Sequence, residues 1–251
     1  SGGALPTGAG AMLAALKRSG LEVMFANPGT TEMCLVAALD SKGGAGVRPV
    51  LCLHENVVTG AADGYGRVTG KSACCLLHLG VGLTNGAANL HNANRAMTPV
   101  IVIVGEMATW HRGKDAPLEM DISAVAKTVA GKVSLSLTPD QLEKDAAEAA
   151  LFVREFRASH SRVAVLIAPH DCQRERVTGT ARYEFKEGYD NKDRTPFERA
   201  LLLQKAFSAS PPSPSSTPAQ SSSPVAASAI TSALAILRGK RKTAILLGGS
   251  G

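Results

Sequence analysis

Short apolar runs alternate with stretches of helical periodicity along residues 12–168 of the 251-residue chain. The runs rich in β-branched and aliphatic residues predict strands at residues 23–25, 50–53, 73–77, 100–104, 133–137 and 163–168. The amphipathic stretches between them predict helices at residues 12–18, 32–39, 56–67, 85–95 and 140–157. Continuous apolar strands separated by such helices are typical of a parallel sheet covered on both faces. We therefore expect an α/β, doubly wound fold with a mostly parallel sheet and helices on both faces.

The alternation ends near Asp171, and the composition changes after it. Residues 208–227 are rich in Ser and Pro and have hardly any large apolar side chain, which predicts a disordered, partly extended linker. Beyond it, residues 243–247 resemble a strand followed by glycines, so we expect the start of a second α/β domain. We divide the chain into a first domain at residues 1–172, a linker at 173–227 and the truncated start of a further domain at 228–251.

The composition is that of a globular protein, with 45% hydrophobic and 19% charged residues. The net charge of +6 suggests nucleic acid as a possible kind of partner. The basic residues are scattered, however, and their densest cluster, at residues 238–242, contains no aromatic residue. We therefore expect no nucleic-acid partner. No apolar run approaches the length of about 18 residues that crosses a membrane, so we expect no membrane association.

The chain contains five cysteines, an odd number, and no C-x-x-C motif. Most of them lie in apolar runs, which indicates buried free thiols in a reducing compartment, cytoplasmic or organellar, and a protein that is not secreted. The chain begins with Ser1 instead of Met and stops directly after a strand-like run. We therefore expect it to be a piece of a longer polypeptide.

Several candidate residues follow predicted strands at the carboxyl edge of the sheet, where open α/β sheets bind their ligands. Glu55 comes directly after an apolar run and opens the helical stretch at residues 54–70. A carboxylate at the end of a buried strand is costly, because burial disfavours its charged form. Such a group is usually retained for proton chemistry or for a specific partner. Glu55 is therefore the first candidate for a functional residue.

Two further candidates follow the next two predicted strands. His78 precedes the glycine-rich segment GVGLTNG at residues 80–86, which resembles a phosphate-binding turn. The segment is neither G-x-G-x-x-G nor a P-loop, so a plain strand-to-helix turn remains an alternative. His78 is either a structural histidine or a proton-transfer group. Glu106, which follows the strand at residues 100–104, either caps a turn or lines a pocket.

Other kinds of chemistry are disfavoured. The chain has no G-x-S-x-G motif, which argues against hydrolysis by a Ser-His-Asp triad. Its remaining histidines do not share metal-ligand spacing with carboxylates, so we expect no metal site built by these residues alone.

Four motifs in a fixed order resemble a known family. LCLHENVVTGAADGYGRVTGK and LLHLGVGLTNGAANLHNANRAMTPVIVIVGE follow FANPGTTEM and precede DAPLEMDISAVAKTV. Together they resemble the N-terminal pyrimidine-binding domain of thiamine-diphosphate-dependent enzymes, in the group of acetolactate synthase and benzoylformate decarboxylase. The resemblance covers residues 5–175 and is strongest to bacterial proteins similar to the acetolactate synthase large subunit.

The resemblance implies a role for Glu55. In the family, the glutamate at this position hydrogen-bonds a ring nitrogen of the aminopyrimidine of the cofactor and favours its imino form. The imino group then removes a proton from the thiazolium carbon, which makes this carbon a nucleophile toward a 2-keto acid. The cofactor is the electron sink, and the protein supplies orientation and polarity. The resemblance thus implies decarboxylation of 2-keto acids, carboligation, or both.

Further residues are carried over onto the matching positions. Pro28, Gly29 and Thr30 match the loop that borders the pyrimidine, and His78 matches a pocket histidine of the benzoylformate decarboxylase group that transfers protons. The resemblance also implies contacts to the cofactor or substrate from a wider set of residues. These are Gly80, Gly82 and Asn85 for the cofactor, and Asn27, His54 and Glu106 for the substrate pocket.

Some positions depart from the acetolactate synthase pattern. Val81 stands where the family usually has Pro, and Pro117, Leu118 and Glu119 stand where acetolactate synthases have Phe-Gln-Glu. Acetolactate synthases also tend to lack a histidine at the position of His78. These departures argue against acetolactate formation itself.

The family binds the cofactor diphosphate through Mg²⁺ on a separate domain with a Gly-Asp-Gly…Asn motif, which these 251 residues do not contain. In the family this domain comes from another subunit, so the resemblance implies a homo-oligomer, dimeric or tetrameric, and a fragment that is inactive by itself. The sequence leaves FAD binding open. Two alternatives remain, a non-catalytic truncated paralogue that serves as a dimerisation or regulatory module, and a nucleotide-binding Rossmann protein, which the missing fingerprint disfavours.

Overall fold

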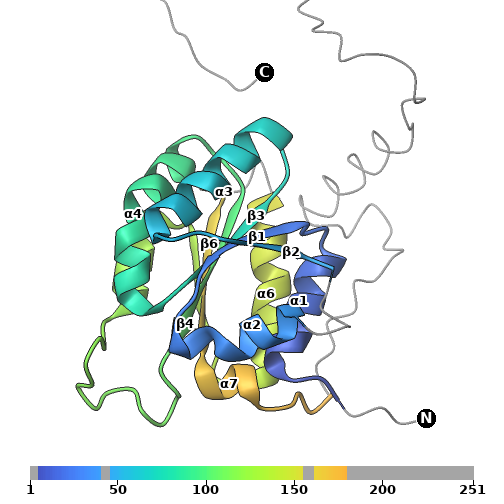
Figure 1. The fold of residues 1–251 in the computed structure, drawn as a ribbon, viewed down its shortest axis with the longest axis vertical. Coiled ribbons are helices and arrows are strands. Elements are labelled where there is room, and N and C mark those ends of the chain that lie inside the picture. The colour runs from blue at the N-terminus through green and yellow to red at the C-terminus, as the bar shows by residue number, and fades with distance from the viewer. Residues whose placement is uncertain (1–4, 41–45, 155–160, 180–251) are drawn as a thin grey trace, which may run out of the picture. The chain divides into compact units, whose positions relative to one another are not determined.

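The computed structural model describes residues 5–40, 46–154 and 161–179, which form a six-stranded parallel sheet with helices on both sides (Figure 1). The strands lie in the order β2-β1-β3-β4-β6-β5, and every neighbouring pair is parallel. Their bounds are Val23–Asn27 (β1), Arg48–Leu51 (β2), Ala73–Leu77 (β3), Val100–Glu106 (β4), Lys132–Leu135 (β5) and Val163–Pro169 (β6). The expected α/β, doubly wound fold is confirmed.

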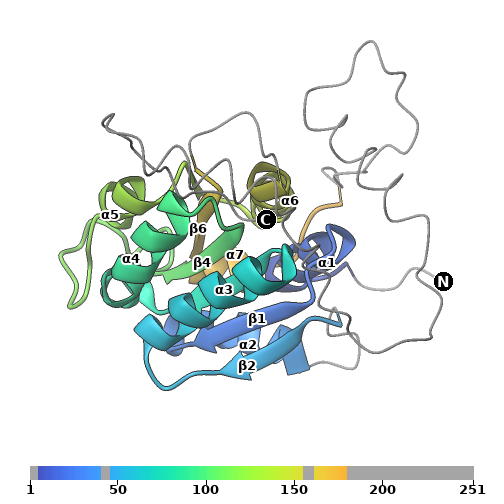
Figure 2. The ribbon, with the colours of Figure 1, turned by 90° about the horizontal axis from the view of Figure 1, so that it is seen from above.

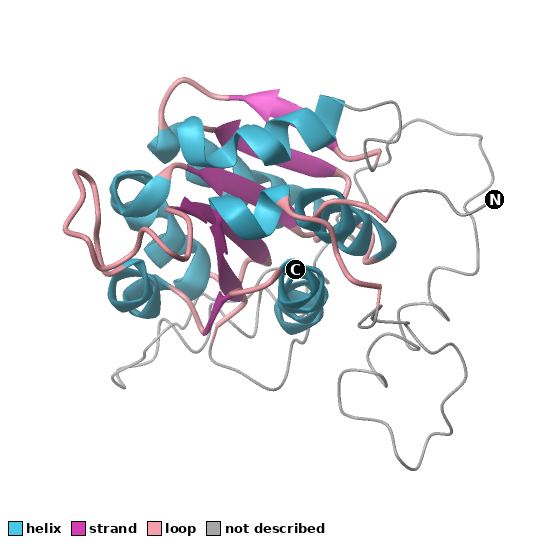
Figure 3. Ribbon diagram, turned by 90° about the horizontal axis from the view of Figure 1, so that it is seen from below, coloured by secondary structure: helices cyan, strands magenta, loops and turns pink. Residues whose placement is uncertain are grey.

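The helices follow the strands in alternation along the chain. Their bounds are Gly8–Arg18 (α1), Thr30–Glu32 (the 3₁₀ turn η1), Met33–Asp40 (α2), Glu55–Thr69 (α3), Leu79–Arg95 (α4), Ile122–Val129 (α5), Pro139–Arg154 (α6) and His170–Arg174 (α7). Figure 3 shows helices on either side of the strands. None of the helices in the described ranges has the length and apolar character needed to cross a membrane.

Alternate residues of the central strands face two separate cores, as the two-residue period of a strand requires. On β3, Cys74 and Leu76 belong to the core beneath α1, α2 and α6, while Cys75 and Leu77 belong to the core beneath α3, α4 and α5. Figures 1 and 2 show α3 beside α4 on one face and α1 beside α6 on the other. The central strands are therefore apolar on both faces, as their sequence predicted.

The run before Glu55 is the exception. The strand β2 lies at the edge of the sheet and covers Arg48–Leu51, two residues earlier than predicted, and Pro49 within it is tolerated because an edge strand has one unpaired side. Leu51 is 71% exposed and Leu53 is 89% exposed. The expectation that Glu55 follows a buried strand is therefore wrong, because an apolar run alone does not distinguish an edge strand from a central one.

Other boundaries also differ from the sequence pattern. Helix α4 begins at Leu79, so the glycine-rich segment forms its first turns instead of a separate turn before residue 85. Helices α5 and α7 were not predicted as elements. The predicted linker and the predicted start of a second domain cover residues 173–251, of which the structure describes only residues 173–179. That division of the chain therefore stays a prediction.

Candidate functional site

The parallel strands bring the predicted site residues to one edge of the sheet. Asn27 ends β1, His78 directly follows β3, and Glu106 ends β4. The Asn27 side-chain amide donates a hydrogen bond of 2.9 Å to the carbonyl of Cys52, which ties the end of β1 to the loop before α3. Residues far apart in sequence thus share the carboxyl edge, where α/β sheets form their ligand sites.

Glu55 is the first residue of α3, and its side chain reaches the first turns of α4. His54 caps α3 by accepting a hydrogen bond from the backbone N–H of Asn56 at its Nδ1, at 3.1 Å. The Glu55 Oε2 accepts a hydrogen bond of 3.1 Å from the amide of Asn85. A Cβ atom at Gly82 would lie 3.3 Å from Glu55 Oε1, so a glycine here lets the carboxyl rest against α4.

The two oxygens of this half-buried carboxyl group are therefore in different situations. Oε2 is held by Asn85, whereas no described residue donates a hydrogen bond to Oε1. The side chain of Asn85, which was predicted to contact the cofactor, thus donates a hydrogen bond to Glu55 in this structure. One carboxyl oxygen is positioned and the other is left available to an external partner.

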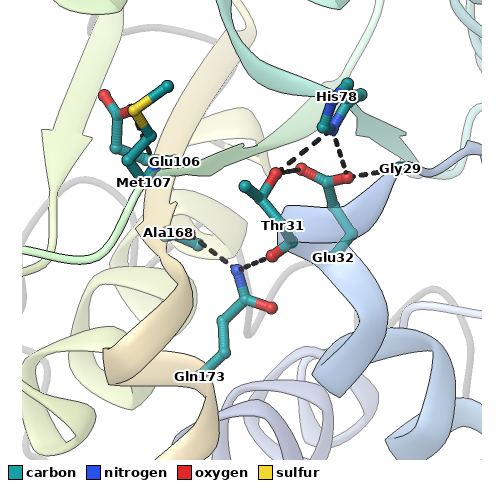
Figure 4. A network of polar contacts seen from close by, with 8 residues as sticks. All are labelled: Gly29, Thr31, Glu32, His78, Glu106, Met107, Ala168 and Gln173. Atoms are coloured by element: carbon teal, nitrogen blue, oxygen red, sulfur yellow. Dashed lines mark hydrogen bonds and ion pairs between the residues drawn. The ribbon is translucent and has the colours of Figure 1, made fainter. Parts of the chain in front are cut away.

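A second polar cluster lies at the same edge, around the fully buried carboxyl of Glu32 (Figure 4). Glu32 Oε2 accepts a hydrogen bond of 2.7 Å from the backbone N–H of Gly29 and lies 2.9 Å from Nδ1 of His78. The Thr31 hydroxyl donates to Glu32 Oε1, and its oxygen lies 3.2 Å from the same Nδ1. His78 is thereby joined to the loop at residues 28–30, which was predicted to border the pyrimidine.

Close packing around this cluster depends on two glycines. A Cβ at Gly29 would lie 2.4 Å from Nδ1 of the His78 ring. A Cβ at Gly105 would lie 1.5 Å from Glu32 Oε1. Beneath the cluster, the amide of Gln173 donates to the carbonyls of Thr31 and Ala168, at 3.0 and 2.7 Å, and so links α7 to the turn η1 (Figure 4).

Glu32 was not predicted as a site residue, because the sequence pattern indicates only the start of a helix at this position. One local signal was present. Gly29 and Glu32 have the spacing of a capping box, in which the acidic side chain bonds the backbone N–H three residues earlier. That pattern predicts the bond to Gly29, but the contact with His78 depends on the pairing of β1 with β3, which local sequence does not show.

Glu106 is 4% exposed and lies at the end of β4. Burial raises the pKa of its carboxyl group, while the backbone N–H of Met107, which donates a hydrogen bond of 2.8 Å, and the Arg112 guanidinium at 3.6 Å act in the opposite direction. Within the described residues, no hydrogen bond joins Glu106 to the Glu32 cluster or to Glu55. Glu106 thus shares the edge of the sheet but is not a member of either cluster.

The raised pKa of Glu106 has a consequence for stability. A carboxyl group whose folded-state pKa lies above its unfolded value of about 4.3 stabilises the fold fully at low pH, and that contribution is lost as pH rises through the folded value. We therefore expect the unfolding free energy of the wild type to fall, relative to that of Glu106→Gln, as pH rises from about 4 to 7. Urea unfolding of both proteins across this range measures the difference.

Glu22 provides a control of opposite sign. Its hydrogen bond from Lys71 lowers the pKa of this exposed carboxyl group, with a further contribution from Tyr65. Stability contributed by such a group is present above the unfolded pKa and is lost as pH falls. The wild type should therefore gain stability relative to Glu22→Gln as pH rises from about 3 to 5, and should show no further gain at higher pH. Equal slopes for the two variants would refute the role assigned to burial.

Among the described residues, no group of three or more His, Cys, Asp or Glu side chains is placed to hold a metal ion.

Comparisons with known proteins show which family part of the chain resembles. Residues 6–125 match the family described as thiamine pyrophosphate enzyme, N-terminal TPP binding domain. The chain is 51% identical over 164 residues to a Mycobacterium tuberculosis protein provisionally named acetolactate synthase large subunit IlvX, covering 65% of this chain and 31% of that protein. It is 33% identical over 144 residues to the acetolactate synthase of Arthrospira platensis, covering 57% of this chain and 25% of that enzyme.

A solved structure gives the same fold at lower sequence identity. The thiamine diphosphate-dependent 4-hydroxybenzoylformate decarboxylase of Rhodococcus jostii RHA1 superposes with a TM-score of 0.65 at 21% identity, covering 81% of this chain and 38% of that one. The chain spans 31% or less of the length of the two acetolactate synthase relatives. With the four ordered motifs and the parallel sheet, these matches show that residues 6–125 resemble the N-terminal TPP binding domain of thiamine pyrophosphate enzymes.

Proposed function

We propose that the whole protein to which this domain belongs is a thiamine-diphosphate-dependent enzyme that decarboxylates 2-keto acids, joins them to an acceptor, or does both. The observation that carries the proposal is the placement of Glu55, whose carboxyl group starts α3 at the carboxyl edge of the sheet. Its Oε2 is held by Asn85 at 3.1 Å, and its Oε1 faces the glycine-rich start of α4. A carboxyl group fixed in this way is suited to share a proton with an aromatic ring nitrogen.

The residues at this edge fit an aminopyrimidine ring. Glu55 offers one unengaged carboxyl oxygen, and Gly82 adds no side chain beside it. The loop at Pro28, Gly29 and Thr30 follows β1, which lies between the edge strand β2 and β3. When bound, thiamine diphosphate supplies the electron sink for cleaving or forming a bond at the keto carbon, and the protein supplies orientation and a proton acceptor.

The remaining candidates would serve the substrate. His78 exposes part of its ring at the same edge, with 22% of its side chain accessible, and we propose that it transfers a proton to or from the keto acid. Asn27, His54 and Glu106 are proposed to line the pocket. We further propose that Mg²⁺ and the diphosphate are held by a domain of another subunit, so that the active protein is a homo-oligomer.

Binding measurements test this proposal. Because Mg²⁺ and the diphosphate are assigned to another domain, we expect the 251-residue chain to bind thiamine diphosphate at least about 100-fold more weakly than the whole protein does. This loss corresponds to about 2.7 kcal/mol of binding free energy. Isothermal titration of both proteins, with Mg²⁺ and with a chelator, measures it.

Two outcomes would contradict the proposal. Tight, Mg²⁺-dependent binding by the 251-residue chain would show that it already holds a diphosphate site. The absence of thiamine diphosphate binding by the whole protein would instead support a non-catalytic dimerisation or regulatory module.

A further inference from the structure

We infer that Glu32 is a positioning residue for His78, which it holds as the tautomer protonated at Nδ1 so that Nε2 is the nitrogen that exchanges protons with the substrate. This inference rests on the proposed role of His78 in proton transfer. It adds a residue of the turn η1 to the candidate site.

The hydrogen bonds around Glu32 decide which ring nitrogen carries the proton. The backbone N–H of Gly29 is a donor, so Glu32 Oε2 accepts in that bond at 2.7 Å. The Thr31 hydroxyl donates its hydrogen bond to Glu32 Oε1, so toward His78 it can act only as an acceptor. Both neighbours of His78 Nδ1, the carboxylate at 2.9 Å and the hydroxyl at 3.2 Å, are therefore acceptors. Nδ1 must be the donor.

The second nitrogen of the His78 ring, Nε2, has no hydrogen-bond partner among the described residues. The contacts drawn from His78 to Thr31 and Glu32 in Figure 4 are both made by Nδ1. In a neutral imidazole with its proton on Nδ1, Nε2 is the acceptor. The group at the edge of the sheet is thus a proton acceptor, and after accepting a proton it becomes the donor.

The Glu32 carboxylate is held in this orientation by its surroundings. Glu32 has no exposed surface, and its two oxygens accept bonds from three donors on two elements. Gly105 closes the space on the side of β4, because a Cβ there would overlap Glu32 Oε1. A hydrogen bond accepted by a carboxylate with this support is stronger than one between neutral groups, and it fixes both the orientation and the tautomer of a histidine ring.

Nitrogen chemical shifts test the inference directly on the 251-residue chain, because they report which ring nitrogen is protonated. The His78 resonances are assigned by their loss in His78→Gln. We expect neutral His78 to carry its proton on Nδ1 in the wild type. In Glu32→Ala the ratio of the Nδ1–H to the Nε2–H form should fall at least about tenfold, as loss of a hydrogen bond to a charged group implies. An Nε2–H tautomer in the wild type overturns the inference without any variant.

Two further proteins separate positioning from general destabilisation. Glu143→Ala removes another buried carboxylate, which pairs with Arg18 at 2.8 Å between α6 and α1, and it should leave the His78 tautomer unchanged. Glu32→Gln keeps the shape of the side chain if Glu32→Ala fails to fold, and it should also shift the ratio toward Nε2–H because an amide can accept at only one of its two terminal atoms. An unchanged ratio in Glu32→Gln contradicts the inference.

Kinetics of the whole protein then connect the tautomer to the reaction. With a 2-keto acid substrate, Glu32→Gln should lower kcat by about 10-fold to 100-fold, and the double variant with His78→Ala should be no slower than His78→Ala alone. Additive losses would show that Glu32 does not act through His78. If the whole protein does not use thiamine diphosphate, the proposed function fails, while the tautomer measurement still decides the role of Glu32.

Discussion

Replacing Glu55 with Gln in the whole protein should reduce turnover of a 2-keto acid by about 10²-fold to 10⁴-fold, the range typical for loss of a positioned acid–base group. The amide can still accept the hydrogen bond from Asn85, so the start of α3 should keep its place. The amide cannot exchange a proton with a ring nitrogen as a carboxyl group does. Steady-state kinetics with saturating thiamine diphosphate and Mg²⁺ measure the loss.

The control for this experiment is Glu148→Gln, which changes an equivalent charge on α6 beside Lys132. Both variants should unfold at about the wild-type temperature, and only Glu55→Gln should lose activity. A Glu55→Gln protein with the wild-type rate would refute the assignment of Glu55. A Glu55→Gln protein that unfolds far below the wild type would show that Glu55 has a structural role instead.

Gly105→Ala should produce the largest loss of stability among single additions of one methyl group at the site. The new Cβ would lie 1.5 Å from Oε1 of the fully buried Glu32 and 2.7 Å from Oγ1 of Thr31. Overpacking typically costs about 1–3 kcal/mol, and displacing a buried hydrogen-bonded carboxylate adds a similar amount. We expect the unfolding free energy to fall by about 3 kcal/mol or more. Urea denaturation of the 251-residue chain measures the change.

Gly64→Ala is the matched control, because the same methyl group is added where nothing lies within 4 Å, on the exposed side of α3. Alanine is favoured over glycine inside a helix by about 0.5–1 kcal/mol, so this variant should be slightly more stable than the wild type. If Gly105→Ala were as stable as Gly64→Ala, the packing of Glu32 against β4 would be disproved.

Local patterns in the sequence were sufficient for the central part of the fold. The strand Ala73–Leu77 was predicted with its correct bounds, because it is apolar on both faces and is flanked by polar residues. The edge strand was misplaced, since Val50 and Leu51 are as apolar as core residues although Leu51 is 71% exposed. The start of α4 was missed because glycines favour turns locally, whereas here they give Glu55 and Thr59 room against the helix.

The site was predictable only where one residue carries its own signal. His78 directly follows β3 and Glu55 begins the helix after β2, so their place at the carboxyl edge follows from the alternating pattern. Glu32 gave no comparable signal, because its contact with His78 joins residues 46 positions apart through the pairing of β1 with β3. The hydrogen bond from Asn85 to Glu55 likewise depends on the packing of α4 against α3. Tertiary contacts of this kind are set by topology, which short motifs do not encode.

The central claim is that Glu55 supplies the proton chemistry of bound thiamine diphosphate. Its most direct test is the rate at which the proton on the thiazolium carbon between nitrogen and sulfur exchanges with deuterium, measured by NMR after acid quench. The cofactor is bound to the whole protein, with occupancy verified for both the wild type and Glu55→Gln. We predict exchange at least about 100-fold faster on the wild type than on Glu55→Gln. Equal exchange rates on the two fully occupied proteins would contradict the claim.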